Sequence, residues 1–267
     1  SSTRVRFEST TTFNLANITI NSLNQGSAFY DNISQKINYR AGLIIDPGNA
    51  NNVANQRLTS LVFDCVEYNL AVTNTPNVIL VKRITAINGN RTQNPNDGTV
   101  LNQFVDDTSS PQQGNDNSPN WPNNYLIGAI DGGKIKPDDE IEYTVYFLNI
   151  GNGEAGDVRI CDRITANQDF LPDAYAAARG IQLRLGNSPQ TNLTNANDSA
   201  DRAQLIAPGG VVPANCNIQG ANSNGTVQID ITGNTGSPSL TTMPGSTGQG
   251  TPKKSYGLIR FTTNVQP

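Results

Sequence analysis

The chain has 267 residues, of which 36% are apolar and only 15% are charged, and its net charge is -4. It contains no histidine, so the commonest general base and the commonest transition-metal ligand are missing, and most enzyme classes are disfavoured. The 18 Lys and Arg residues are interspersed with 22 Asp and Glu residues. This pattern offers no basic stripe for a nucleic acid and no apolar run of the roughly 20 residues that a membrane-spanning helix needs.

Residues 1–25 form a first segment in which apolar and polar side chains alternate, with a break at Ala16-Asn17 that suggests a bulge or a second strand. Its apolar residues are Val5, Phe7, Phe13, Leu15, Ile18 and Ile20. Two interpretations stay open: the segment pairs as a strand within its own subunit, or it is a donor strand that adds to a sheet edge of the next subunit. The second arrangement is head-to-tail and does not close, so it predicts a homopolymer of identical subunits.

Residues 26–76 are predicted to be a β-rich region. Apolar runs at 37–45 and 58–72 are separated by a turn at 46–48 and a polar loop. Pro76 ends this region, because proline cannot continue a hydrogen-bonded ladder. Cys65 lies within the second run, where we expect a buried free thiol rather than a crosslink to another subunit.

Residues 77–267 are predicted to be a β-sandwich with long loop insertions, which makes the chain an all-β protein. Period-two alternation or a high Val and Ile content marks the strands, which are expected at 77–87, 125–130, 140–148, 155–164, 181–185, 211–212, 226–231 and 255–265. One short helix is expected at 172–179, ending at Gly180. The loop at 88–124 is long enough to be functional or disordered.

The clearest pattern runs from Lys136 to Ile164, where turn, strand, turn and strand follow one another. Its key positions are Pro137, Asp139, Ile141, Tyr143, Val145, Phe147, Asn149, Gly151, Ala155, Val158, Ile160, Asp162 and Ile164. At these positions the chain resembles the bacterial surface module known as domain of unknown function 11. The resemblance covers about residues 77–267, and the phrase VKRITAING and the Cys161-Asp162 position are similar to cyanobacterial members. It implies an immunoglobulin-like sandwich of a secreted or cell-surface protein, with no catalytic residues.

The three cysteines cannot all pair within one chain. Cys161 ends a predicted strand and Cys216 lies in a Pro- and Asn-rich loop before another strand, so we pair these two as a disulfide. Metal binding by cysteine is disfavoured, because no CxxC spacing and no histidine accompany these residues. The start of the sequence, SSTRVRFE, has no Met and no apolar run. It fits a secreted chain whose signal peptide has been removed, and fits a trimmed chain equally.

Two further features suggest a ligand. Asp and Asn clusters supply the oxygen atoms that calcium prefers, with Asp106, Asp107, Asp198 and Asp201 as candidate ligands. The same residue types are also ordinary turn formers, and no EF-hand spacing is present. Trp121, which has a proline on either side, is a candidate surface contact for a glycan or a protein partner, or else a plug that fills its own loop.

Together these features predict a secreted, non-enzymatic structural subunit of an extracellular filament or pilus-like fibre, joined by β-strand complementation. The alternative is a cell-surface adhesin whose loops at 88–124 and 232–254 bind carbohydrate or protein without polymerisation. A glycosidase that uses two carboxylates is a third class. It needs two acids that face one cleft, and the sequence does not pair them.

Overall fold

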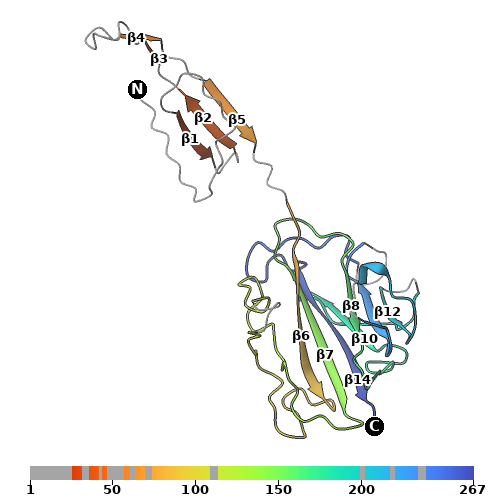
Figure 1. The fold of residues 1–267 in the computed structure, drawn as a ribbon. Coiled ribbons are helices and arrows are strands. Elements are labelled where there is room, and N and C mark those ends of the chain that lie inside the picture. Colours follow the sequence, from red (N-terminus) through yellow and green to blue (C-terminus); the bar gives the residue numbers. More distant parts are fainter. Residues whose placement is uncertain are drawn as a thin grey trace. The chain divides into compact units, whose positions relative to one another are not determined.

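The structure is a computed structural model (Figure 1). It describes residues 74–108, 114–198, 202–216, 220–233 and 239–267, and the backbone of strands β1 to β5 in the preceding part of the chain. The chain divides into two compact units, Ser1–Thr73 and Asn74–Pro267. The predicted arm at residues 1–25 lies outside the described residues, so its pairing stays a prediction. Its side chains are Val5, Phe7, Phe13, Leu15, Ile18 and Ile20.

The described strands of the first unit pair in antiparallel fashion, so this region is β-rich as predicted. They are β1 (Gly26–Asp31), β2 (Lys36–Ala41), β3 (Ile44–Asp46), β4 (Arg57–Ser60) and β5 (Asp64–Asn69). One sheet has the order β1-β2-β5, and β3 pairs with β4. Cys65 lies in β5 opposite Arg40 of β2. Its side chain is not among the described ones, so the free thiol stays a prediction.

The second unit is built on a six-stranded antiparallel sheet with the order β11-β10-β14-β7-β6, in which β9 also pairs with the end of β14. The strands are β6 (Val78–Ile87), β7 (Glu140–Asn149), β9 (Gln168–Phe170), β10 (Ile181–Leu185), β11 (Thr191–Leu193) and β14 (Tyr256–Val265). Alternation along β7 directs Val145 and Phe147 to one face and Tyr146 and Leu148 to the other. All four side chains are buried, so both faces of the sheet are covered.

A three-stranded antiparallel sheet, β12-β13-β8, packs against one of these faces. Its strands are β8 (Arg159–Arg163), β12 (Ala203–Ile206) and β13 (Thr226–Asp230). The main core lies between the two sheets, and its fully buried members include Phe147, Leu183, Val227 and Ile259. Figure 1 shows β8 and β12 to one side of the layer that holds β6, β7 and β14. The predicted all-β fold, a β-sandwich with long loops, is confirmed.

The long loop after β6 covers the opposite face of the six-stranded sheet. Trp121 and Leu126 from this loop pack on Tyr146 of β7 and Tyr256 of β14 in a second buried cluster. Leu101, from the same loop, is fully buried in a third cluster at the end of β6. The described parts of the loop therefore contribute to the core, so this long segment has a structural role in the second unit.

The helix predicted at 172–179 is wrong. The segment forms a tight turn in which Ala176 and Arg179 bridge each other and Ala178 has a positive φ of 54°. A helix of two turns is unstable unless tertiary contacts favour it. Here the Asp173 carboxylate accepts from the Ala178 amide, and the Asn195 side chain bonds the backbone at both ends of the segment, so the tertiary contacts favour the turn.

Two predicted strands are also wrong. Residues 125–130 form no strand. The Tyr146 hydroxyl binds both the N–H and the C=O group of Ile127, and within this segment only Ala129 forms a bridge to β6. Residues 211–212 are irregular, and the Val211 side chain is 93% exposed. The sequence pattern missed β9, β11 and β12, whose three or four residues are too few to show a clear alternation.

Candidate functional site

β6 and β8 are edge strands of the two sheets and lie on the same side of the sandwich. Each ends the strand order of its sheet within the described ranges, and Lys82 of β6 meets Asp162 of β8 across the space between them. A groove of about 360 Å³ runs here, lined by Leu80, Val145 and Ile160 among others. Because the smaller sheet is narrower, it leaves the inner face of β6 partly uncovered, and Leu80 is 40% exposed.

The backbone of β8 has a free edge toward this groove. The Ile164 amide and the Val158 carbonyl both bond to the side on which β13 lies. Along an antiparallel strand, the backbone N–H and C=O groups of successive residues point to alternate sides. Between Val158 and Ile164, the odd-numbered residues therefore direct these groups away from β13. These residues are Arg159, Cys161 and Arg163. No strand of the described part of the chain pairs with this edge.

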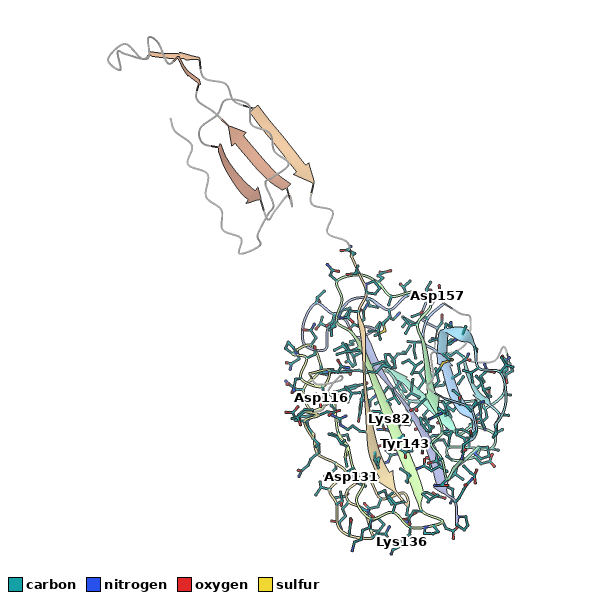
Figure 2. The ribbon with its side chains drawn as sticks, viewed as in Figure 1. Lys82, Asp116, Asp131, Lys136, Tyr143 and Asp157 are labelled. Carbon is teal, nitrogen blue, oxygen red and sulfur yellow. A yellow bond between two sulfur atoms is a disulfide. The ribbon has the colours of Figure 1, made fainter. Side chains whose placement is uncertain are left out.

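The ion pair between Lys82 and Asp162 joins the two sheets at the groove. The Lys82 Nζ atom lies 2.8 Å from Oδ1 and 2.7 Å from Oδ2 of Asp162. It also lies over the rings of Tyr143 and Phe261, at 4.4 Å and 5.4 Å from their centroids. Figure 2 shows Lys82 beside Tyr143 in the middle of the second unit. The lysine side chain therefore bridges the two sheets at the edge of the groove, where it remains 36% exposed.

The predicted disulfide between Cys161 and Cys216 is present, with 5.4 Å between the Cα atoms. It ties β8 to the short 3₁₀ helix η3 (Ala214–Cys216). The Arg159 guanidinium adds to this attachment by donating to the Asn215 side chain. The residue next to Asp162 is therefore covalently fixed, which restricts the position of the Asp162 backbone at the groove.

The other face of β6 is held against its own loop by a buried ion pair. Arg83 and Asp116 are 3% and 1% exposed at their side chains, and their closest atoms, Nη2 and Oδ2, are 2.5 Å apart. Arg83 also donates to the Val105 carbonyl. Farther along, Ile84 and Ala129 exchange backbone hydrogen bonds. The loop therefore covers this face of β6, and through Ala129 it also covers part of the backbone edge of β6. In contrast, no described strand covers the edge of β8.

Trp121 is part of this cover. Its side chain is 5% exposed, its indole N–H donates to the Asn115 carbonyl at 2.7 Å, and its ring stacks on Tyr125. An indole that is only 5% exposed and hydrogen-bonded within its own chain presents very little surface to a glycan. The predicted surface contact at Trp121 is wrong, and the alternative of a loop plug holds.

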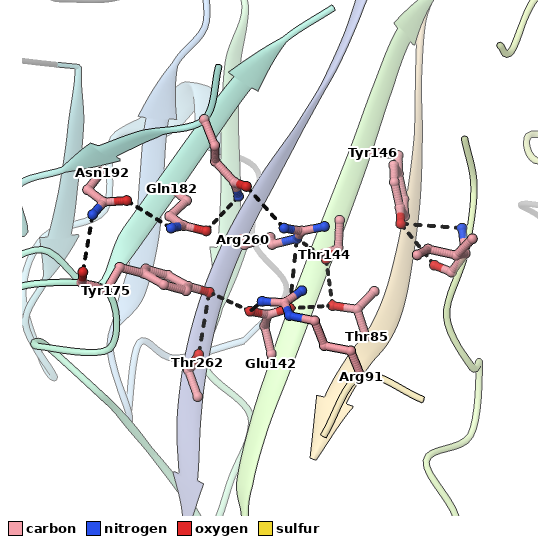
Figure 3. A network of polar contacts seen from close by, with 12 residues as sticks. Thr85, Arg91, Glu142, Thr144, Tyr146, Tyr175, Gln182, Asn192, Arg260 and Thr262 are labelled. Atoms are coloured by element: carbon pink, nitrogen blue, oxygen red, sulfur yellow. Dashed lines mark hydrogen bonds and ion pairs between the residues drawn. The ribbon is translucent and has the colours of Figure 1, made fainter. Parts of the chain in front are cut away.

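A band of polar side chains crosses the outer face of the six-stranded sheet (Figure 3). Glu142 of β7 lies at its centre and is buried. Its carboxylate accepts hydrogen bonds from the hydroxyls of Thr85 and Tyr175 and pairs with the guanidinium of Arg91, and Arg260 lies 3.7 Å from it. The band continues across β10 and β11 through Gln190, Gln182 and Asn192.

The band opens to solvent in a hollow of about 520 Å³. Its polar lining includes Arg91, Glu140, Glu142, Asp173 and Tyr175. Burial, followed by the nearby charge of Glu142, raises the pKa of Tyr175, so its hydroxyl stays protonated at neutral pH. An aromatic ring among carboxylate and guanidinium groups can contact a polar, hydroxylated ligand. Alternation places Glu142 at a polar position of β7. The sequence does not show that this position is buried or which groups bind the carboxylate.

The described calcium candidates, Asp106, Asp107 and Asp198, have hydrogen-bond partners within the chain. Asp106 accepts from the Asn117 side chain, and the Asp107 amide donates to the Asp116 carboxylate. Asp198 follows β11 and accepts from Thr194. Asp201 lies outside the described residues. Among the side chains that can be placed, no group of three or more His, Cys, Asp and Glu residues could hold a metal ion, so calcium binding stays a prediction.

Comparison of the chain with protein-family models, with curated proteins and with solved structures gives no match in any of the three. None of the helices in the described ranges has the length and apolar character that crossing a bilayer requires.

Proposed function

We propose that the protein is a structural subunit of an extracellular filament or pilus-like fibre, assembled head-to-tail by β-strand complementation. The observation that carries this proposal is the free edge of β8 beside the uncovered inner face of β6. A strand added to β8 would widen the smaller sheet and cover Leu80, which is 40% exposed.

The proposed donor is residues 1–25 of a neighbouring subunit. β8 has five residues, so an incoming strand would pair over about 17 Å at the usual rise per residue. The run FNLANITI supplies two apolar pairs, Phe13 with Leu15 and Ile18 with Ile20. A bulge at the break between the pairs, Ala16-Asn17, would bring both pairs to the face that meets the groove. Because donor and acceptor lie on different parts of the chain, the contact repeats without closing and generates a polymer.

The proposed location is the cell surface or the extracellular space. The disulfide between Cys161 and Cys216 supports an oxidising compartment. The motif resemblance to domain of unknown function 11, over about residues 77–267, supports a secreted bacterial protein and, through VKRITAING, a cyanobacterial one. The partners in this proposal are identical subunits, without nucleic acid, cofactor or membrane insertion, and the role is not enzymatic.

A proline substitution at the edge of β8 tests whether subunits assemble by adding a strand there. Arg163→Pro removes an N–H that faces away from β13, so the sandwich keeps its own ladder while an incoming strand loses a donor. Arg163→Ala is the matched control, because it loses the same contact of Arg163 with the Ala221 carbonyl and retains the N–H. Light scattering should show assembly that is impaired only in the proline variant. Equal assembly by both folded variants would exclude this edge.

The hollow beside Glu142 favours a second candidate function, a cell-surface adhesin that binds carbohydrate without polymerising. Arg91 lines this hollow with a half-exposed side chain. A glycan array would show binding by the unmodified chain and its loss in Arg91→Ala, with Lys136→Ala as a control of equal charge change. Absence of binding to any glycan would remove this candidate.

A further inference from the structure

The geometry points to a covalent crosslink between Lys82 and Asp162: we propose that these side chains join in an intramolecular amide bond between the two sheets. Lys82 Nζ lies 2.8 Å and 2.7 Å from the two oxygens of the Asp162 carboxylate, so it faces the carboxyl carbon rather than one oxygen. The inference is independent of the filament proposal, because it concerns a single subunit.

The surroundings distinguish this pair from an ordinary surface ion pair. The amine lies over the rings of Tyr143 and Phe261, and the latter is a member of the main core. Asp162 Oδ2 is buried and lies 2.7 Å from Lys82 Nζ, but it accepts no hydrogen bond of acceptable geometry. Holding charged groups between two sheets costs desolvation free energy, and a neutral amide removes both charges from that position.

The position of both residues is fixed by the fold. Lys82 lies in the regular part of β6, where its backbone pairs with Val145 of β7. Asp162 pairs with Val227 of β13 and follows Cys161, which is held by the disulfide. Two reactants that a rigid scaffold holds in contact react as if at effective concentrations of about 10⁵ to 10⁸ M, which favours condensation over hydrolysis.

The reaction balances within the pair. Lys82 carries an ammonium group and Asp162 a carboxylate. The nitrogen lone pair, freed by proton loss, attacks the carboxyl carbon, one carbon–oxygen bond breaks, and two ammonium protons leave with that oxygen as water. No oxidant and no further reactant are required. The Lys82 and Asp162 side chains are 36% and 18% exposed, and the groove beside them lets the water leave.

The crosslink would join the two sheets at β6 and β8, where no backbone hydrogen bonds of the described residues connect them. β6 and β8 belong to different sheets, and no ladder in the described residues joins those sheets. With the disulfide at Cys161, two covalent bonds would then fix β8, one to β6 and one to η3. The edge strand that borders the groove would thereby resist pulling and local unfolding, which suits an extracellular protein under load.

The mass of the intact chain tests the proposal. Full-length protein is incubated at neutral pH for several days and then reduced and alkylated. The unmodified sequence should be lighter than calculated by one water molecule, whereas Lys82→Arg, which keeps the ion pair but cannot lose its charge, should have its full calculated mass. Tandem mass spectra of a digest should show the peptides that carry Lys82 and Asp162 joined.

Asp162→Asn provides a second readout, because condensation with an asparagine releases ammonia instead of water. Its mass should fall short by one ammonia molecule. Asp162→Ala should have its full mass. An unmodified chain at its full calculated mass, with the Lys82 and Asp162 peptides recovered separately, would overturn the proposal. The decisive sample is the natural sequence, so the result does not depend on whether a variant folds.

Discussion

Removal of one partner from the buried pair between Arg83 and Asp116 is expected to destabilise the second unit strongly. Both side chains are almost fully buried, and Asp116 Oδ2 accepts from Arg83 and from the Asp107 amide. In Arg83→Met the carboxylate keeps only the backbone donor and has no positive charge beside it. Breaking a buried pair in this way costs about 3 to 5 kcal/mol, and the loss of the bond to the Val105 carbonyl adds about 1 kcal/mol.

Replacing both partners should cost far less. The pair is incompletely satisfied, because Arg83 Nε and Asp116 Oδ1 have no hydrogen-bond partner. A variant with both Arg83→Met and Asp116→Leu removes the two charges together and keeps apolar volume under the loop. The Val105 carbonyl and the Asp107 amide still lose their partners, at about 1 kcal/mol each. The free energy of unfolding of the double variant should therefore lie within about 2 kcal/mol of that of the natural sequence.

Urea denaturation of the natural sequence, both single variants and the double variant measures this comparison. The two single losses should add to much more than the loss in the double variant, which gives a large coupling energy. A single variant Arg83→Met that loses less than about 1 kcal/mol, or two single losses that simply add, would refute the reasoning that this pair is buried and mutually dependent.

Three further predictions concern stability. Cys161→Ala should lower the free energy of unfolding by about 4 kcal/mol in urea titrations, because the disulfide spans 55 residues, and reductant should have no further effect on this variant. Gly257→Ala should cost about 1 to 3 kcal/mol or more, because its Cβ would lie 2.3 Å from the Phe147 ring, whereas Gly156→Ala, with open space around it, should be neutral. Burial raises the pKa of Tyr175 above that of the unfolded chain. Stability should therefore hold at neutral pH and decline above about pH 10, where the unfolded tyrosine ionises. A free energy of unfolding that stays constant up to the alkaline transition would contradict this.

Strands with strong alternation could be predicted from the sequence, and elements decided by distant contacts could not. β7 and β10 follow the predicted ranges closely, because their apolar side chains repeat every two residues along the strand. The segment around Tyr175 has the composition of a helix but becomes a turn. Its conformation is set by Asn195 and by the attraction of Tyr175 to Glu142, which are both remote in sequence.

The candidate sites were predictable to a smaller extent. The disulfide could be predicted from the place of Cys161 at a strand end and of Cys216 in the following loop. The pair of Lys82 and Asp162 could not, because it depends on which strands become the edges of two different sheets. For Trp121 the sequence suggested a surface contact that the structure does not contain. An isolated aromatic residue in a polar loop is typical of a contact surface, but here the side chain packs on the outer face of the sheet.

Electron microscopy of negatively stained protein tests most directly whether free sheet edges join identical subunits. Purified full-length chain should form fibres of uniform width, and the chain that lacks residues 1–25 should remain as single particles. Single particles in both samples, at concentrations where the chain is folded, would contradict the account.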